Sequence, residues 1–244
     1  MTSLYSMTQA AKMDHSMIER FSLSEEKLID CAATLAFEFS LPHIKDKRVL
    51  FLVGKGNNGS DALKMAELSL GVADKVYVFP LFEGGNEENM RRRSLLPSSL
   101  FVSDIVDCDT IVDAVFGFSF HGKLDERVEG IFSRLEECDC YKIALDVPSA
   151  FSYHASSTIT FMCGKNELYY PENREKCGDI HLFNPGFPES EFPSSDTSLL
   201  SLSDYAVPPF SFYSYKNTRG HLLLAGGSTR YPGAPLLSSL AAFH

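Results

Sequence analysis

The feature that most constrains the fold is an apolar strand that runs into a glycine-rich turn and then into a helix, over residues 49–63. The turn reads Gly-Lys-Gly-Asn-Asn-Gly-Ser-Asp from Gly54 to Asp61. Glycine lets the backbone adopt positive φ and approach a bound molecule closely, and the start of the helix offers unpaired N–H groups to an anion. The segment therefore predicts a strand–turn–helix unit whose turn faces a ligand, with a nucleotide phosphate as the expected group.

Further apolar runs recur along the chain, with helical patterns between at least the first four of them. We expect strands at residues 49–54, 75–80, 110–117, 141–147, 158–164 and 178–184. Buried runs of this kind, separated by helices, are typical of a mainly parallel sheet that is covered on both faces. The predicted fold class is α/β, a Rossmann-like three-layer αβα sandwich with a mainly parallel sheet.

Two helices are expected before the first strand. Met13, Met17 and Phe21 recur at helical spacing and predict an amphipathic helix. Ser22 and Glu25 fit a capping box, which predicts that a second helix begins there.

Charge and composition exclude several classes of partner. A net charge of −10 argues against a broad nucleic-acid interface, which needs clustered basic side chains. The short run Arg91-Arg92-Arg93 fits a solvated helix face. Residues 1–9 lack the apolar core of a signal peptide, and no run approaches the roughly 20 apolar residues that span a bilayer. We expect a soluble cytoplasmic protein that binds neither nucleic acid nor membrane, with scattered cysteines that are reduced thiols and not zinc ligands.

The chain is expected to have one main domain over residues 1–190 and a linker over residues 191–214, which is rich in Pro, Ser and Asp. Residues 215–244 begin with another strand and glycine turn, at residues 220–228, and continue into a helix over residues 234–243. Because one strand and one helix cannot bury a core of their own, this segment is either the opening of a further domain or an appendage of the first.

The glycine turn allows two interpretations. The Gly-x-Gly-x-x-Gly pattern at residues 54–59, with Glu83 after the second strand, satisfies the dinucleotide-binding fingerprint. Asn57, Asn58 and Asp61 add amide oxygens and a carboxylate, which suit sugar contacts or a cation. Alternatively, the two asparagines only tolerate the turn, and Asp61 only caps the helix.

Two further strands end in an acid. Asp113 lies in the apolar run at residues 111–117, and Asp146 ends the run that begins at residue 143. A carboxylate buried in such a run is costly without a partner. Since ligands of open α/β sheets bind beyond the carboxyl ends of the strands, we expect the glycine turn, Asp113 and Asp146 to converge.

Three ordered motifs together resemble the NAD(P)H-hydrate epimerase family, the YjeF N-terminal domain. That family has a Gly-x-Gly-Asn-Asn-Gly-Gly-Asp-Gly turn, an Asp-Ala-hydrophobic-hydrophobic-Gly strand end and an Asp-hydrophobic-Pro-Ser-Gly strand end. The corresponding segments here are residues 54–62, 113–117 and 146–150. The order and context match from about residue 7 to residue 188.

The resemblance implies an isomerase that interconverts the R and S forms of hydrated NADH and NADPH, which carry a hydroxyl at C6 of the nicotinamide ring. It implies that Asp146 contacts the ring and transfers the proton, and that a potassium ion is held by Asn58, Asp113 and Ser149. The resemblance also allows a homo-oligomer. The residues that it implies for the dinucleotide, besides Asp146, are Asn57, Asn58, Gly59, Ser60, Asp61, Gly117, Phe118, Ser119, Phe120, His121, Gly122 and Lys123.

The tail carries a second resemblance. Residues 216–234 are similar to the opening of the ADP-dependent NAD(P)H-hydrate dehydratase domain, a ribokinase-like fold that many bacterial members carry behind the epimerase. We therefore expect a fragment of a bifunctional repair enzyme, without dehydratase activity in this chain.

Three positions depart from the family pattern, because Ser60, Ala62 and Ala150 replace glycines. If those glycines hold positive φ, each replacement strains the backbone by about 1 kcal/mol or more. Two alternatives therefore stay open. One is a catalytically lapsed binding or scaffold module of the same fold. The other is an NAD-dependent dehydrogenase that uses the glycine turn and Glu83, although no histidine or lysine stands out as its catalytic group.

Overall fold

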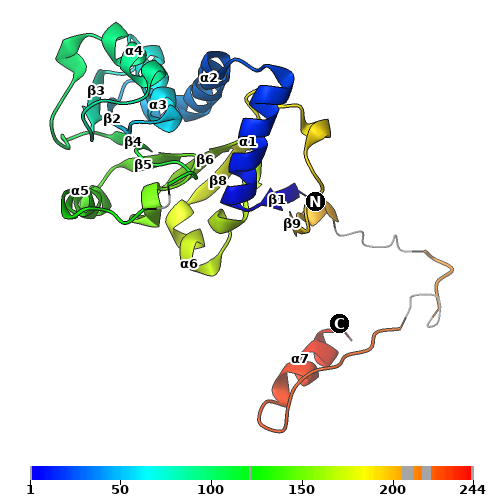
Figure 1. The fold of residues 1–244 in the computed structure, drawn as a ribbon. Coiled ribbons are helices and arrows are strands. Elements are labelled where there is room, and N and C mark those ends of the chain that lie inside the picture. Colours follow the sequence, from blue (N-terminus) through cyan, green and yellow to red (C-terminus); the bar gives the residue numbers. More distant parts are fainter. Residues whose placement is uncertain (1, 121, 205–210, 216–220, 243–244) are drawn as a thin grey trace. The chain divides into compact units, whose positions relative to one another are not determined.

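The computed structural model describes residues 2–120, 122–204, 211–215 and 221–242 (Figure 1). The chain divides into two units, Met1–Ser201 and Leu202–His244. Among the described residues, no helix has both the length and the apolar character needed to cross a membrane.

A six-stranded parallel sheet forms the centre of the larger unit, in the order β3-β2-β4-β5-β6-β8. The strands are β2 (Arg48–Val53), β3 (Lys75–Pro80), β4 (Thr110–Ala114), β5 (Tyr141–Leu145), β6 (Ser157–Phe161) and β8 (Asp179–Phe183). From β2 the chain moves to one side to form β3 and then returns to the other side of β2 to form β4. The carboxyl ends of β2 and β4 therefore flank a topological switch point, where ligands of such sheets bind.

Helices cover both faces of this sheet, which confirms the predicted three-layer α/β fold (Figure 1). On one face, alternate residues of β2 such as Phe51 pack against α2 (Glu25–Ile44) and α3 (Asn57–Ser69). On the other face, Leu50 and Leu52 belong to a second core with α5 (Glu126–Glu137). Burial on both faces explains why these strands are continuous apolar runs in the sequence.

A small second sheet, in the order β7-β1-β9, is a feature that the sequence did not predict. It joins β1 (Thr2–Tyr5), β7 (Gly164–Lys165) and β9 (Thr197–Leu199), with β1 parallel to β7 and antiparallel to β9. β1 leads directly into α1 (Met7–Phe21), whose buried face holds the predicted Met13 and Met17 together with Ala10. Phe21, the third residue of the predicted apolar face, is exposed at the end of the helix.

The predicted capping box at Ser22 and Glu25 is wrong. Ser22 has φ 49° and closes the carboxyl end of α1, while Ser24 caps α2 by accepting the Lys27 backbone N–H. The capping box belongs to α1 instead, where the Ser6 side chain accepts the Gln9 N–H and the Gln9 side chain accepts the Ser6 N–H.

The smaller unit contains a short 3-10 helix, Leu202–Asp204, and α7 (Gly233–Ala242), which occupies most of the helix expected near the end of the chain. Of the strand and turn expected at residues 220–228, residues 221–228 are described, and they form no strand.

Candidate functional site

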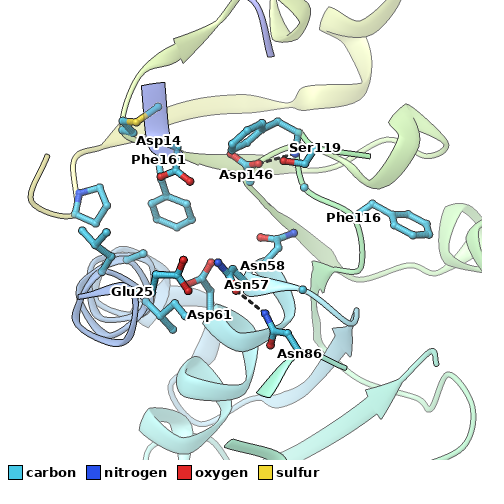
Figure 2. A pocket seen from close by; sticks show the side chains of 18 of the residues that line it. Asp14, Glu25, Asn57, Asn58, Asp61, Asn86, Phe116, Ser119, Asp146 and Phe161 are labelled. Carbon is cyan, nitrogen blue, oxygen red and sulfur yellow. Dashed lines mark hydrogen bonds between the residues drawn. The ribbon is translucent and has the colours of Figure 1, made fainter. Parts of the chain in front are cut away.

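A pocket of about 620 Å³ opens at the switch point, beyond the carboxyl ends of β2, β4 and β5 (Figure 2). Its walls come from α1, α2, the glycine turn, the loop after β4 and the residues that follow β5 and β6. The predicted site residues that line it are Asn57, Asn58, Asp61, Gly117, Phe118, Ser119, Phe120 and Asp146. Gly59, Ser60, Gly122, Lys123, Asp113 and Ser149 do not line it, and His121 lies outside the described residues.

The glycine turn is held by close backbone packing, not by positive φ. A Cβ added to Gly54 would lie 1.9 Å from the Val115 carbonyl oxygen, and one added to Gly59 would lie 2.4 Å from the Gly54 carbonyl oxygen. Gly56, in contrast, has open space around it. It is the N-cap of α3 and supplies no side-chain cap, so the N–H groups of the first turn remain available to an anionic ligand.

Two adjacent asparagines offer different hydrogen-bonding groups to the pocket. Asn57 Oδ1 accepts a hydrogen bond from Asn86 Nδ2 at 2.6 Å (Figure 2), which leaves the Asn57 Nδ2 donor without an acceptor among the described residues. Asn58 Nδ2 donates to the Leu145 carbonyl oxygen at 3.2 Å, and its buried Oδ1 has no hydrogen-bond partner among the described residues. Asn57 therefore offers a donor, whereas Asn58 offers an acceptor or a cation ligand.

Helix α4 (Glu87–Leu95) supports the turn from behind. The fully buried Asn89 donates through Nδ2 to the carbonyl oxygens of Gly54 and Gly56 at 3.1 and 3.4 Å. Arg93 donates to the same Gly54 oxygen at 3.3 Å.

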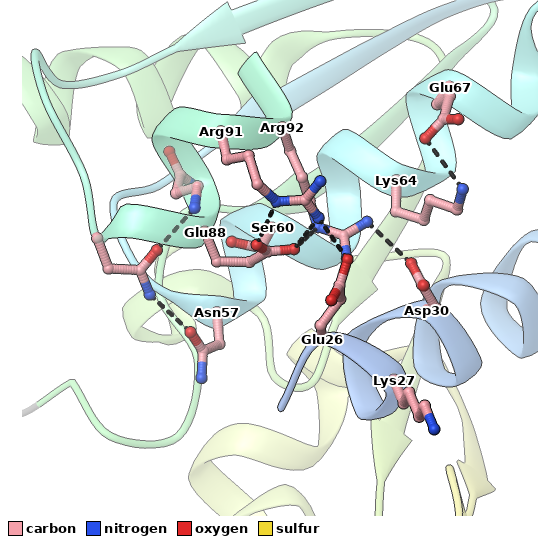
Figure 3. A network of polar contacts seen from close by, with 12 residues as sticks. Glu26, Lys27, Asp30, Asn57, Ser60, Lys64, Glu67, Glu88, Arg91 and Arg92 are labelled. Atoms are coloured by element: carbon pink, nitrogen blue, oxygen red, sulfur yellow. Dashed lines mark hydrogen bonds and ion pairs between the residues drawn. The ribbon is translucent and has the colours of Figure 1, made fainter. Parts of the chain in front are cut away.

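Helix α4 is tied to α2 by a charged network (Figure 3). Arg92 is only 5% exposed and pairs with Asp30 of α2 and with Glu88, which Arg91 also contacts. The interpretation of residues 91–93 as a solvated helix face is therefore wrong for Arg92 and for Arg93, which is half-buried. The run instead fixes the helix that holds the glycine turn.

Asp146 lies in the pocket wall at the end of β5 and is 6% exposed. Its backbone has φ 70°, a costly conformation for a residue other than glycine that is typical of functional positions. Its Oδ2 accepts the Phe118 N–H at 2.8 Å, and its Oδ1 forms an ion pair with Lys165 Nζ at 2.8 Å. The carboxylate is therefore fixed between the loop after β4 and strand β7.

Lys165 was not identified from the sequence, although it is fully buried and is the counter-ion of Asp146. Its ammonium also donates to Thr160 Oγ1 at 2.8 Å and to the Phe161 carbonyl oxygen at 2.9 Å. The available signal was a lone lysine directly after the strand predicted at residues 158–164.

Asp113 and Ser149, which the family resemblance groups together, are in direct contact. Asp113 is 1% exposed, and each of its oxygens accepts two hydrogen bonds, from the Val115 N–H and Ser149 hydroxyl at one and from the Ser149 N–H and Tyr153 hydroxyl at the other. Burial raises the pKa of this carboxyl, while these hydrogen bonds oppose the rise. Ser149 Oγ also accepts the Phe116 N–H at 2.9 Å, so the group anchors the loop that lines the pocket.

The pocket carries two further acids with raised pKa values. Asp61 is 8% exposed and has no hydrogen bond or ion pair among the described residues, and burial raises its pKa well above the usual range. Asp14 of α1 has its pKa raised to about 6, mainly by burial and then by the nearby Asp146, against the opposing effect of Lys165. The pocket is therefore rich in carboxyls that sit close to one another.

The glycine replacements have unequal consequences. Ser60 and Ala62 lie within α3 and do not have positive φ, so the strain expected at these two positions is absent. Ala150 has φ 52° and ψ 18°, in the left-handed region, so the expectation of strain is met there. Only the residue next to Ser149 carries a conformational cost.

Comparison with known proteins identifies the family. The chain matches the family described as YjeF-related protein N-terminus over residues 25–166, more than half of its length. The chain belongs to this family. As a YjeF-related N-terminus, it has the fold of the yeast protein ynu0, whose crystal structure matches with a TM-score of 0.60 and 17% sequence identity, over 86% of this chain and 96% of that one.

Two relatives of this YjeF-related chain carry names that state an activity. The bifunctional NAD(P)H-hydrate repair enzyme Nnr of Archaeoglobus fulgidus is 30% identical over 244 residues, which cover 93% of this chain and 50% of that enzyme. The NAD(P)H-hydrate epimerase of Aspergillus fumigatus is 32% identical over 161 residues, which cover 60% of this chain and 66% of that enzyme. The chain thus spans about half the length of the bifunctional relatives that it matches.

Proposed function

We propose that this chain interconverts the R and S forms of hydrated NADH and NADPH at the hydroxyl-bearing C6 of the nicotinamide ring. The observation that carries the proposal is Asp146, a strained, ion-paired carboxylate in the wall of the switch-point pocket. The names of the epimerase relatives support this substrate class.

The pocket suits both parts of such a dinucleotide. The uncapped start of α3 and the Asn57 amide offer N–H donors to phosphate or ribose oxygens. Aromatic side chains, among them Phe116, Phe118 and Phe161, also line the pocket and offer apolar surface to the ring.

The chemistry requires proton transfer and no covalent attachment to the protein. The C6 hydroxyl leaves as water once it is protonated, and the electron pair of the neighbouring ring nitrogen forms a C–N double bond that leaves a cationic ring. Water then adds to C6, and the proton that it loses returns to a base. In this proposal Asp146 exchanges this proton, and its contacts with the Phe118 N–H and Lys165 keep the carboxylate oriented.

We also propose that a monovalent cation, potassium by resemblance, binds beside the glycine turn. The unpaired Oδ1 of Asn58 fits this role, because a buried carbonyl oxygen without a donor is a ready ligand for a hard cation. The resemblance adds Asp113 and Ser149, whose oxygens would have to exchange some of their present hydrogen bonds for the cation, and the cation would compensate the buried charge of Asp113. Loss of the activity on replacing potassium with sodium or choline would support the site, and equal rates in all three salts would contradict it.

Residues 215–244 are proposed to correspond to the start of the second domain of the bifunctional relatives. Support comes from matches to the Coxiella burnetii and Dictyoglomus turgidum enzymes, which cover 99% and 98% of this chain and so extend into this segment.

The test is to mix the chain with one separated NADH-hydrate epimer and to follow the appearance of the other by chromatography above the spontaneous rate. We expect conversion by the wild-type chain and by Asp179→Asn, a matched control at an exposed position. Conversion by Asp146→Asn should be at least about 100-fold slower. Far-UV circular dichroism must show that each variant is folded. No conversion by folded wild-type chain would contradict the epimerase function and favour a binding module of the same fold.

A further inference from the structure

Epimerisation at C6 requires proton transfer on both faces of the ring, which one fixed carboxylate does not provide. The ring cation is planar, and inversion requires the hydroxyl to leave from one face and water to add to the other. Asp146 is held by the Phe118 N–H and Lys165, so it serves only one of these faces. A second proton-transfer group is needed on another wall of the pocket.

Three other carboxyls line the pocket, from Asp14 of α1, Glu25 of α2 and Asp61 of α3. Figure 2 shows Asp14, Asp61 and Asp146 around one space, with Phe161 beside Asp14. Electrostatic effects couple each pair among these three aspartates. All three therefore face the same pocket, although they come from different elements.

Burial and exposure separate the candidates. Asp61 lacks any polar partner among the described residues, and burial raises its pKa well above the usual range, so it keeps its proton and is a poor base for the incoming water. Glu25 is exposed in the first turn of α2. Asp14 is half-buried and lines the pocket, so it combines contact with the cavity and a path to water.

We propose that Asp14 is the second proton-transfer residue and serves the ring face that Asp146 does not reach. This assignment rests on the proposed epimerase function. In one direction Asp14 gives its proton to the leaving hydroxyl, and the ion-paired Asp146 carboxylate takes the proton of the water that adds to the opposite face. In the reverse direction the two residues exchange roles, so each turnover releases one water, consumes one water and changes no oxidation state.

The electrostatics of Asp14 suit this task. Its pKa is raised to about 6, so both protonation states are populated near neutral pH, which is the condition for effective acid–base catalysis. The charged or titratable groups that act on it, or on which it acts, are His15, Glu25, Asp61, Asp146, Cys163 and Lys165. Burial is the largest cause of the raised pKa, the acids raise it further, and Lys165 and His15 oppose the rise.

The test uses oxygen exchange to separate the two faces. Each purified NADH-hydrate epimer is incubated with enzyme in water enriched in oxygen-18, and both inversion and label uptake are measured above the spontaneous rates. For Asp14→Asn we expect inversion to fall by about 100-fold or more. The protonated fraction of Asp146 can still expel the hydroxyl and return water on its own face, so one epimer should keep taking up label with retained configuration. Asp146→Asn should show the same behaviour with the opposite epimer.

The outcomes distinguish this proposal from the one on which it depends. A wild-type chain that converts neither epimer would contradict the epimerase function and this inference together. A folded Asp14→Asn variant that inverts both epimers within about threefold of the wild-type rate, in an active wild-type background, would overturn only the role of Asp14. Equal losses of inversion and label uptake for both epimers would indicate a structural role and would also overturn it. Partial recovery in Asp14→Glu would support proton transfer.

Discussion

Replacing Lys165 with methionine should destabilise the larger unit more than replacing both members of its ion pair. The Lys165→Met variant leaves the Asp146 carboxylate, 6% exposed, without its counter-ion. An unpaired buried charge costs about 3–5 kcal/mol in free energy of unfolding. In the double variant Lys165→Met/Asp146→Asn the charge is gone, and the remaining loss is about 1–2 kcal/mol for the hydrogen bonds that the ammonium gave to Thr160 and Phe161.

Urea unfolding at neutral pH measures this difference, and far-UV circular dichroism is the suitable signal because the chain has no tryptophan. For a slope of about 2 kcal/mol per molar urea, the midpoint of Lys165→Met should fall by about 1.5–2.5 M and that of the double variant by about 0.5–1 M. Lys64→Met is the matched control, because its ion pair with Glu67 lies at the surface and contributes less than about 1 kcal/mol. If the effects of Lys165→Met and Asp146→Asn add to the double-variant effect within about 0.5 kcal/mol, the two groups are not coupled and the reasoning fails.

Three other predictions concern the backbone and pH. Ala150→Gly should stabilise the chain by about 0.4–1 kcal/mol, because glycine adopts the positive φ at this position without strain. Ala62→Gly inside α3 should instead destabilise it by about 1 kcal/mol. Changes in stability of the same sign for the two variants would contradict this reasoning. Gly59→Ala should destabilise strongly, since its Cβ would lie 2.4 Å from a backbone oxygen of the turn, while Gly56→Ala meets no neighbour and should be tolerated in the same unfolding assay. The pKa of Asp14 is raised to about 6, so folding favours its neutral form. The neutral carboxyl therefore contributes to the stability of the fold below about pH 4, and this stabilisation is lost as pH rises through 6. The free energy of unfolding of Asp14→Asn should therefore rise by about 1–2 kcal/mol relative to that of the wild type between pH 4 and pH 7.5. A difference in stability between the two that does not change with pH would refute the raised pKa.

The central sheet was largely readable from the sequence because its inner strands, such as β2 and β4, are buried on both faces. The strand expected at residues 75–80 is present as β3, and the others differ from their predicted bounds by a few residues. The residues of β9 and the first two residues of β1 are exposed and include the polar Thr2, Thr197 and Ser198. Only Leu4 and Tyr5 of β1 are buried, which is too short an apolar run to mark a strand. The pairing of these strands depends on contacts between distant segments, which local patterns do not encode.

The parts of the site that local motifs encode were identified, and those that depend on distant partners were not. Asn57, Asn58 and Asp146 stand in recognisable turns and strand ends and line one pocket, while their roles stay predictions. The role of Lys165 becomes visible only in its ion pair with Asp146, which lies 19 residues earlier in the sequence. Asp14 resembles any acid on the polar side of an amphipathic helix until α1 is placed against the pocket.

The pairing of β1 with β7 has a consequence for how the chain acquires its site. Leu4 and Tyr5 lie opposite Gly164 and Lys165, so the strand that carries the buried ammonium is completed by residues about 160 positions away. Contacts of such long sequence separation close slowly in folding because the loop entropy is lost before they form. During synthesis, the first residues of the chain must wait for β7 and β9 to leave the ribosome. We therefore expect refolding to form the helix-covered sheet first and the Lys165 environment last, and an extension fused directly to the start of β1 to slow this final step.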